Sequence, residues 1–116
     1  MILGAEFLFD AAHKIENHKG KCRNLHGHTY KLVVSIDGQV GDDGMVMDFT
    51  DVKSIVKEKV ISILDHSYLN DIIPCSTAEN LAVFIWKKLE NEIPLYEIKL
   101  WENTTSWVSL GREDIK

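Results

Sequence analysis

The sequence predicts an α+β domain, in which an antiparallel sheet of order ββααββ carries two helices on one face. Residues 2–13 and 25–37 alternate apolar and polar side chains, as half-buried strands do. Residues 50–64 instead repeat apolar side chains at helical spacing, and a second helical segment follows residue 76. Two shorter alternating segments close the chain. Strands grouped apart from helices are typical of a sheet that is covered on one side.

The first two strands are expected to pair as a long hairpin around a polar loop at residues 14–23. Side chains two residues apart on a strand point to the same side. The expected core faces are Ala5, Phe7, Phe9, Ala11 and His13 on one strand, and His26, His28, Tyr30, Leu32, Val34 and Ile36 on the other. Both apolar faces therefore end in histidine.

Two helices are expected next. A turn cluster at residues 38–44 and a short extended segment at 45–49 lead into the first, with Asp48 or Thr50 as N-cap. Its apolar stripe is Val52, Ile55, Val56, Val60, Ile63 and Leu64. Residues 76–79 have the Ser-x-x-Glu pattern of a capping box, and the second helix should end near Asn91, ahead of Pro94.

The strand expected at residues 95–102 ends in a carboxylate. Tyr96, Ile98, Leu100 and Glu102 share one face, and a turn at residues 103–105 leads to a last strand at 106–110. An ordinary edge-strand glutamate is one interpretation of Glu102. The other follows because a buried charge needs a partner: the carboxylate accepts two parallel N–H donors from a planar ligand edge, such as that of a guanine or a pterin.

Composition limits the classes of function. The 116 residues fit one domain, 1–116, and no apolar run approaches the roughly 20 residues that span a bilayer. The first residues lack the features of a secretory signal, and two cysteines, Cys22 and Cys75, are too few for a disulfide framework. A net charge of −5 argues against a general nucleic-acid binder. We expect a cytoplasmic protein with no membrane or nucleic-acid partner.

His13, His26 and His28 predict a metal site. If the two long strands form the hairpin, all three imidazoles converge at its loop end. Three neutral imidazoles, with a fourth position open to water or substrate, are the zinc environment of catalytic sites. A single histidine on an apolar face is more often a packed, hydrogen-bonded residue. The cluster favours the metal.

Cys22 has two possible roles beside that metal. As a fourth ligand it would close the site and make the zinc structural. Outside the ligand set it would be a thiol whose pKa is lowered by the dication, able to act as a base. Spacing does not separate the two roles.

Asp65 and His66 follow the first helix directly. A histidine at a helix C-terminus is favoured by the helix dipole, which is a purely structural interpretation. The functional alternative is a proton shuttle in which Asp65 fixes the tautomer of His66.

A small basic cluster, Lys14, Lys19, Lys21 and Arg23, lies in the polar loop against one acid, Glu16. It is either a solvated loop or a site for an anionic ligand such as a phosphate ester.

Six motifs resemble the 6-pyruvoyl-tetrahydropterin synthase family, in that family's order and over nearly the whole chain. They are FLFDAAH (7–13), CRNLHGH (22–28), MDF (47–49), LDHSYLN (64–70), STAENLA (76–82) and the strand ending at Glu102. The short spacing from cysteine to histidine resembles the 6-carboxy-tetrahydropterin synthase branch of queuosine and archaeosine biosynthesis. The tail WENTTSWVSL departs from the family in lacking a tyrosine after the glutamate.

The resemblance implies the tunnelling fold (T-fold), in which subunits join their sheets into a barrel, usually as a homohexamer of two stacked trimers with sites between subunits. It implies Zn²⁺ on His13, His26 and His28, and Cys22 as proton acceptor with Asp65 and His66 as relay partners. Glu102 would anchor the pterin and join the relay. Thr77 would contact the ring.

The implied reaction converts 7,8-dihydroneopterin triphosphate to 6-carboxy-5,6,7,8-tetrahydropterin, releasing acetaldehyde and triphosphate. Two alternatives from the same site are the 6-pyruvoyl product and hydrolysis by zinc-bound water. An alternative of another class is a non-catalytic structural zinc module that binds a pterin or a partner.

Overall fold

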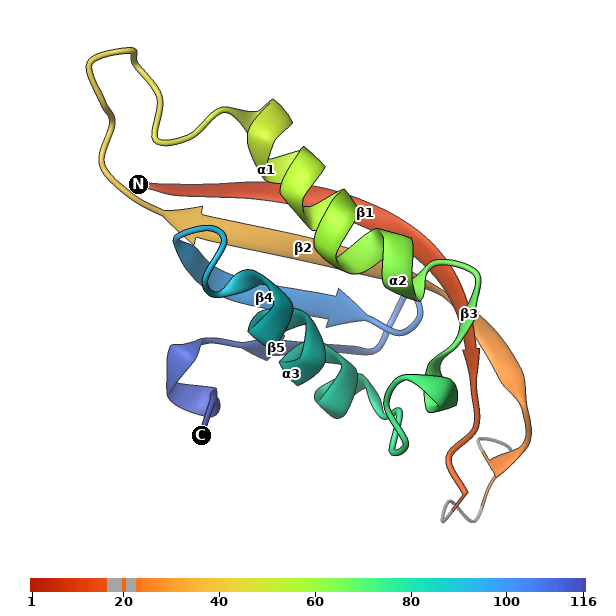
Figure 1. Cartoon of the computed structure of the whole chain (residues 1–116). Coiled ribbons are helices and arrows are strands. Elements are labelled where there is room, and N and C mark those ends of the chain that lie inside the picture. The colour runs from red at the N-terminus through yellow and green to blue at the C-terminus, as the bar shows by residue number, and fades with distance from the viewer. Residues whose placement is uncertain (17–19, 21–22) are drawn as a thin grey trace.

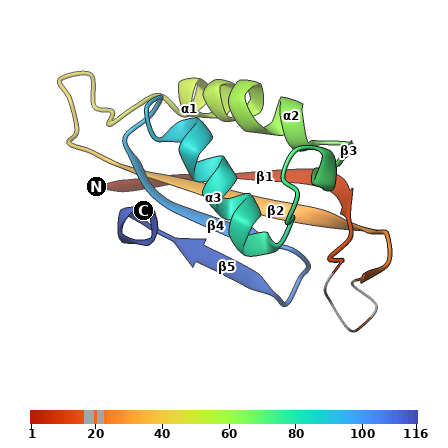
Figure 2. The same cartoon turned by 60° about the horizontal axis from the view of Figure 1, so that its bottom comes forward.

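The computed structural model describes residues 1–16, 20 and 23–116. In this part of the chain, a curved five-stranded sheet of order β3-β1-β2-β4-β5 is covered on one face by helices (Figures 1 and 2). The strands are β1 (Ile2–His13), β2 (His26–Asp37), β3 (Ser67–Tyr68), β4 (Leu95–Trp101) and β5 (Trp107–Leu110). The helices are α1 (Phe49–Val56), η2 (Lys57–Ile61), α2 (Ser62–Leu64), η3 (Leu69–Asp71), α3 (Ala78–Leu89) and η4 (Arg112–Asp114). The predicted α+β class is confirmed.

The long hairpin of β1 and β2 forms the central part of the sheet. β1 and β2 pair antiparallel along their whole length, from Ile2 opposite Asp37 to His13 opposite His26. The predicted apolar faces are the buried ones, with Phe9 only 2% exposed and Tyr30 and Leu32 fully buried. The other face of the hairpin carries no helix in the described chain and exposes Leu8 at 68%.

The sheet contains one parallel strand, β3. The prediction of an antiparallel sheet of order ββααββ is therefore wrong for this strand. β3 pairs parallel with β1, with Ala11 opposite Ser67 and Ala12 opposite Tyr68. A two-residue strand is too short to show a sequence period. Its pairing is held by a long-range contact, in which the amide of His66 donates to the carbonyl of Asp10 at 2.6 Å.

β4 does not keep the predicted alternation at its start. The pairing with β2 shifts at Ser35 and Ile36, so that Leu95 rather than Tyr96 lies opposite Ile36. Leu95 is therefore buried and Tyr96 is 52% exposed. Beyond this bulge the predicted parity holds, and Ile98 and Leu100 are fully buried.

The first helix begins as predicted, because the carboxylate of Asp48 caps α1 by accepting from the amide of Thr50 at 2.7 Å. Residues 46 and 47, before this cap, form a bend. The second cap is Thr77, not Ser76: its hydroxyl accepts from the amide of Asn80. The Ser76 hydroxyl donates instead to Asn70.

The core lies between the helices and the sheet. Val52, Val56, Val60 and Leu64 face it from the continuous helical run α1–η2–α2, and Leu81, Ile85 and Trp86 from α3. No helix among the described residues is both long and apolar enough to cross a membrane.

Replacing Asp48 by alanine should lower the free energy of unfolding by about 1 kcal/mol, because the amide of Thr50 loses its cap. Urea unfolding measures the change, with Asp42→Ala in the preceding loop as the control. Equal losses in the two variants would contradict the capping role of Asp48.

Candidate metal centre and acid–base groups

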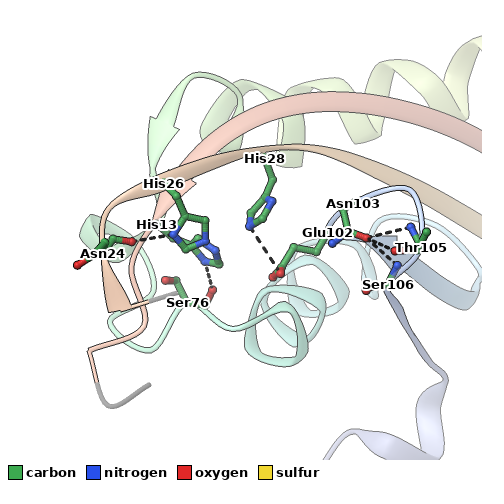
Figure 3. Close-up of polar contacts among 9 residues, drawn as sticks. All are labelled: His13, Asn24, His26, His28, Ser76, Glu102, Asn103, Thr105 and Ser106. Atoms are coloured by element: carbon green, nitrogen blue, oxygen red, sulfur yellow. Dashed lines mark hydrogen bonds and ion pairs between the residues drawn. The ribbon is translucent and has the colours of Figure 1, made fainter. Parts of the chain in front are cut away.

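Three imidazoles converge at the loop end of the β1–β2 hairpin, as the sequence predicts (Figure 3). The register sets His13 directly opposite His26, and His28 opposite Ala11. The ring centroids lie 4.6 Å apart for His13 and His26, 5.1 Å for His13 and His28, and 4.8 Å for His26 and His28. One ligand atom from each ring lies within 4.8 Å of the other two.

Backbone carbonyls fix the tautomer of two of these rings. Nδ1 of His13 is 2.8 Å from the carbonyl oxygen of Ser76, and Nδ1 of His26 is 2.7 Å from that of Asn24. A carbonyl oxygen only accepts, so each Nδ1 carries the proton and donates it. Each Nε2 is then left with a lone pair, which is the form a metal binds.

His28 is held neutral by its surroundings. Burial is the main cause that lowers its pKa, and the neighbouring His13 and His26 lower it further, while the carboxylate of Glu102 opposes them. Oε1 of Glu102 lies 3.6 Å from Nε2 of His28, too far for a hydrogen bond. Glu102 thus stands beside the point on which the three rings converge.

The residues present fit a metal ion. Nε2 of all three histidines is buried and has no hydrogen-bond partner in the described protein, although buried polar atoms are normally paired. Three neutral imidazole nitrogens form the donor set of catalytic zinc sites, which keep one position open. A divalent cation would satisfy the three unpaired atoms together.

The side chains of Asp65 and His66 form the expected pair, and this pair lies apart from the three-histidine cluster. Nδ1 of His66 lies 3.1 Å from Oδ2 of Asp65, and Oδ1 of Asp65 accepts from the amide of Asp10 at 3.0 Å. His66 has a left-handed backbone, with φ 59°, and its side chain is 78% exposed. It therefore projects into solvent instead of capping the preceding helix.

His66 lines an open hollow that lies mainly on the helix-free face of the hairpin. The other residues that line it are Asp10, Ala11, Ala12, Gly27, His28, Thr29 and Ser67. Asp10 and Ala12 alternate with the buried face of β1 that ends in His13. The His66 ring is thus exposed at this hollow, whereas the Nε2 atoms of the three clustered imidazoles are buried, and His28 is common to the hollow and the cluster.

The other residues predicted to belong to the site are Thr77, Cys22 and the basic cluster. Thr77 uses its hydroxyl oxygen as the cap of α3. Cys22, Lys19 and Lys21 lie outside the described residues. In the basic cluster, Lys14 pairs with Glu16 at 3.7 Å and Arg23 is exposed.

Sequence reasoning missed three residues that support the site. Asp10 holds both Asp65 and His66 through its backbone, and Ser76 and Asn70 lie behind His13. These contacts join positions far apart in the chain, so no local period reveals them. Their places in the motifs FLFDAAH, LDHSYLN and STAENLA are the one sequence signal that could have drawn attention to them.

Replacing Asp65 by asparagine should remove a pH-dependent part of the stability. The amide of Asp10, and then His66, lower the pKa of Asp65 below its usual value of 3.8. The carboxylate therefore stabilises the folded state fully above that value and ceases to do so as the pH falls through the lowered value. Urea unfolding from about pH 6 to about pH 3 should show a steeper loss in the wild type than in Asp65→Asn. Identical slopes would refute this role.

Comparison with known proteins agrees with this architecture. The profile described as 6-pyruvoyl tetrahydropterin synthase matches residues 2–113. A protein of Haemophilus influenzae named 6-carboxy-5,6,7,8-tetrahydropterin synthase is 38% identical, over 90% of this chain and 94% of its own length. One of Dictyostelium discoideum named 6-pyruvoyl tetrahydrobiopterin synthase is 40% identical, over 93% of each.

A solved structure shares the fold. The 6-pyruvoyl tetrahydropterin synthase of Caenorhabditis elegans superposes with a TM-score of 0.87 at 26% identity, covering 96% of this chain and 94% of that one. With the family profile spanning nearly the whole sequence, the chain belongs to the 6-pyruvoyl tetrahydropterin synthase family.

Proposed function

We propose that this chain is a zinc-dependent lyase that converts 7,8-dihydroneopterin triphosphate, with uptake of water, to 6-carboxy-5,6,7,8-tetrahydropterin, acetaldehyde and triphosphate. The observation that carries the proposal is the set of three unpaired Nε2 atoms beside Glu102. Membership of a family of tetrahydropterin synthases supports the pterin substrate and the lyase chemistry.

His13, His26 and His28 would hold the zinc, which supplies Lewis-acid stabilisation of negative charge on the substrate's side-chain oxygens. Glu102 would accept two N–H groups from the aminopyrimidinone edge of the ring. It is a half-buried carboxylate beside His28, so it would fix the ring next to the metal position.

Proton transfer would fall to Cys22, Asp65 and His66. Cys22, four residues before His26, would take the proton from the substrate carbon attached to the ring. His66 would act as the partner acid and base, with Asp65 holding its Nδ1 side. No external redox cofactor is required, because moving protons between carbon and the ring reduces the ring internally.

The placement of these groups favours an active site built between subunits. The His66 ring is exposed to solvent while the Nε2 atoms of the three imidazoles are buried, so a second copy would bring an acid–base group to the metal position. A homohexamer of two trimers, as the family resemblance implies, would supply such contacts.

The reaction is tested by mass spectrometry of the products after zinc-loaded protein meets 7,8-dihydroneopterin triphosphate. We expect the 6-carboxy-tetrahydropterin mass together with acetaldehyde. A 6-pyruvoyl product would assign the chain to the other branch, represented among its relatives by the Dictyostelium protein. Unchanged substrate would contradict catalysis and favour a structural zinc module.

Replacing Cys22 by alanine should lower kcat by about 100-fold or more, because the general base is lost. Zinc content should stay at the wild-type value. Cys75→Ala is the matched control, since Cys75 is an exposed free thiol and its replacement should leave turnover unchanged. Full activity of Cys22→Ala would favour hydrolysis by zinc-bound water, and loss of the zinc would identify Cys22 as a ligand.

A further inference from the structure

Asn70 uses every hydrogen-bonding position of its side-chain amide. Oδ1 accepts from the amide of Lys14 at 3.1 Å and from the hydroxyl of Ser76 at 2.9 Å. Nδ2 donates to the carbonyls of Lys14 at 2.9 Å and Pro74 at 3.2 Å. The amide has two donors and two acceptor lone pairs, so its capacity is fully used.

One side of this amide is bonded to the residue after a proposed metal ligand. Both backbone groups of Lys14 are bonded to Asn70, as they would be to a neighbouring strand. Lys14 directly follows His13, at the point where β1 ends. Asn70 therefore fixes the backbone of β1 where the strand pairing stops.

The other side of the amide holds the loop that orients the His13 ring. Pro74 and Ser76 are bonded to Asn70, and the carbonyl of Ser76 is the acceptor for Nδ1 of His13. Ser76 is fully buried, so its hydroxyl needs a protein partner, and Asn70 is that partner. The backbone and the ring of His13 are thus both tied to one side chain.

The ring of His26 is oriented in a different way from the ring of His13. Its Nδ1 is bonded to the carbonyl of Asn24, only two residues away, so its orientation is set locally. His13 depends instead on a carbonyl that lies 63 residues away in the sequence. Of these two rings, His13 is the one whose acceptor carbonyl must be held in place by a tertiary contact.

We propose that Asn70 is a positioning residue for the metal centre, holding His13 in the tautomer and orientation that direct its Nε2 to the metal. The inference rests on the proposed zinc site and extends it to a residue that does not contact the metal. Partners behind a ligating histidine commonly contribute a factor of about 10–100 to metal affinity.

The first experiment compares the Zn²⁺ affinity of Asn70→Asp with that of Asn80→Asp. Asn70→Asp keeps the acceptor oxygen but loses both N–H donors. A carboxylate oxygen would then face the carbonyls of Lys14 and Pro74. Asn80 donates to the carbonyl of Cys75 in the same loop and, among the described residues, makes no hydrogen bond to Lys14 or Ser76, so it is a matched control. We expect a dissociation constant about 10–100-fold higher for Asn70→Asp and no change for Asn80→Asp. Equal affinities in the wild type and Asn70→Asp would overturn the proposal.

A second measurement does not involve the metal. Long-range ¹H–¹⁵N NMR of the metal-free protein reports the tautomer of each imidazole. In Asn70→Asp the His13 signals should show mixed tautomers, while those of His26 keep the Nδ1–H form. Unaltered His13 signals would overturn the positioning role.

Ser76→Ala carries the test if Asn70→Asp does not fold, because it removes only the hydroxyl link to Asn70. It should weaken Zn²⁺ binding and perturb the His13 tautomer in the same direction, and wild-type values in both would refute the proposal. Failure of the wild type to bind zinc would instead refute the proposed metal centre, while the NMR comparison would still decide the role of Asn70.

Discussion

The antiparallel register of β1 and β2 is the constraint on which the rest of the structure depends. Pairing His13 with His26 brings the two rings together and places His28 on the same face. Because side chains alternate along a strand, a slip of one residue in β2 would move His26, His28 and the apolar residues behind them to the opposite face. The candidate metal centre and the core are therefore specified by the same register.

The segment between α2 and α3 contains the Asp65–His66 pair and connects it to that hairpin. It is tied to β1 at Asp10 through Asp65 and His66, at Ala11 and Ala12 through β3, and at Lys14 through Asn70. These bonds give a non-periodic stretch a defined path along the edge of β1. They also present His66 with an exposed ring on one face while Ser76 reaches His13 on the other. The segment thus carries residues of both parts of the proposed site.

Much of the fold follows from local pattern. The alternation in residues 2–13 and 25–37 determines which face is buried, and the core of Phe9, Tyr30 and Leu32 agrees with it. The helical spacing after Asp48 gives the covering helix and its cap. The pattern could not give the parallel pairing of β3 or the bulge that buries Leu95 instead of Tyr96, because both depend on contacts distant in sequence. The choice of Thr77 over Ser76 as the cap depends on the loop, where Asn70 engages the Ser76 hydroxyl.

The candidate site also combines features that the sequence pattern predicts with features that depend on tertiary contacts. The meeting of His13, His26 and His28 follows from strand parity and hairpin pairing, and the position of Glu102 follows from the parity of β4 beyond its bulge. The orienting carbonyl of Ser76 and the Asn70 contacts could not be predicted, because they link loops through tertiary structure. Nor does spacing decide whether Cys22 binds the metal or acts beside it.

The most direct test of the account is X-ray absorption at the zinc edge on the resting, zinc-loaded protein. Three imidazoles with one open position predict nitrogen and oxygen ligands only, with Zn–N distances of about 2.0–2.1 Å and no sulfur. That result would leave the Cys22 thiol outside the ligand set, where the proposed chemistry requires it. A sulfur ligand at about 2.3 Å would close the site with Cys22 and contradict the central claim, because the zinc would then be structural.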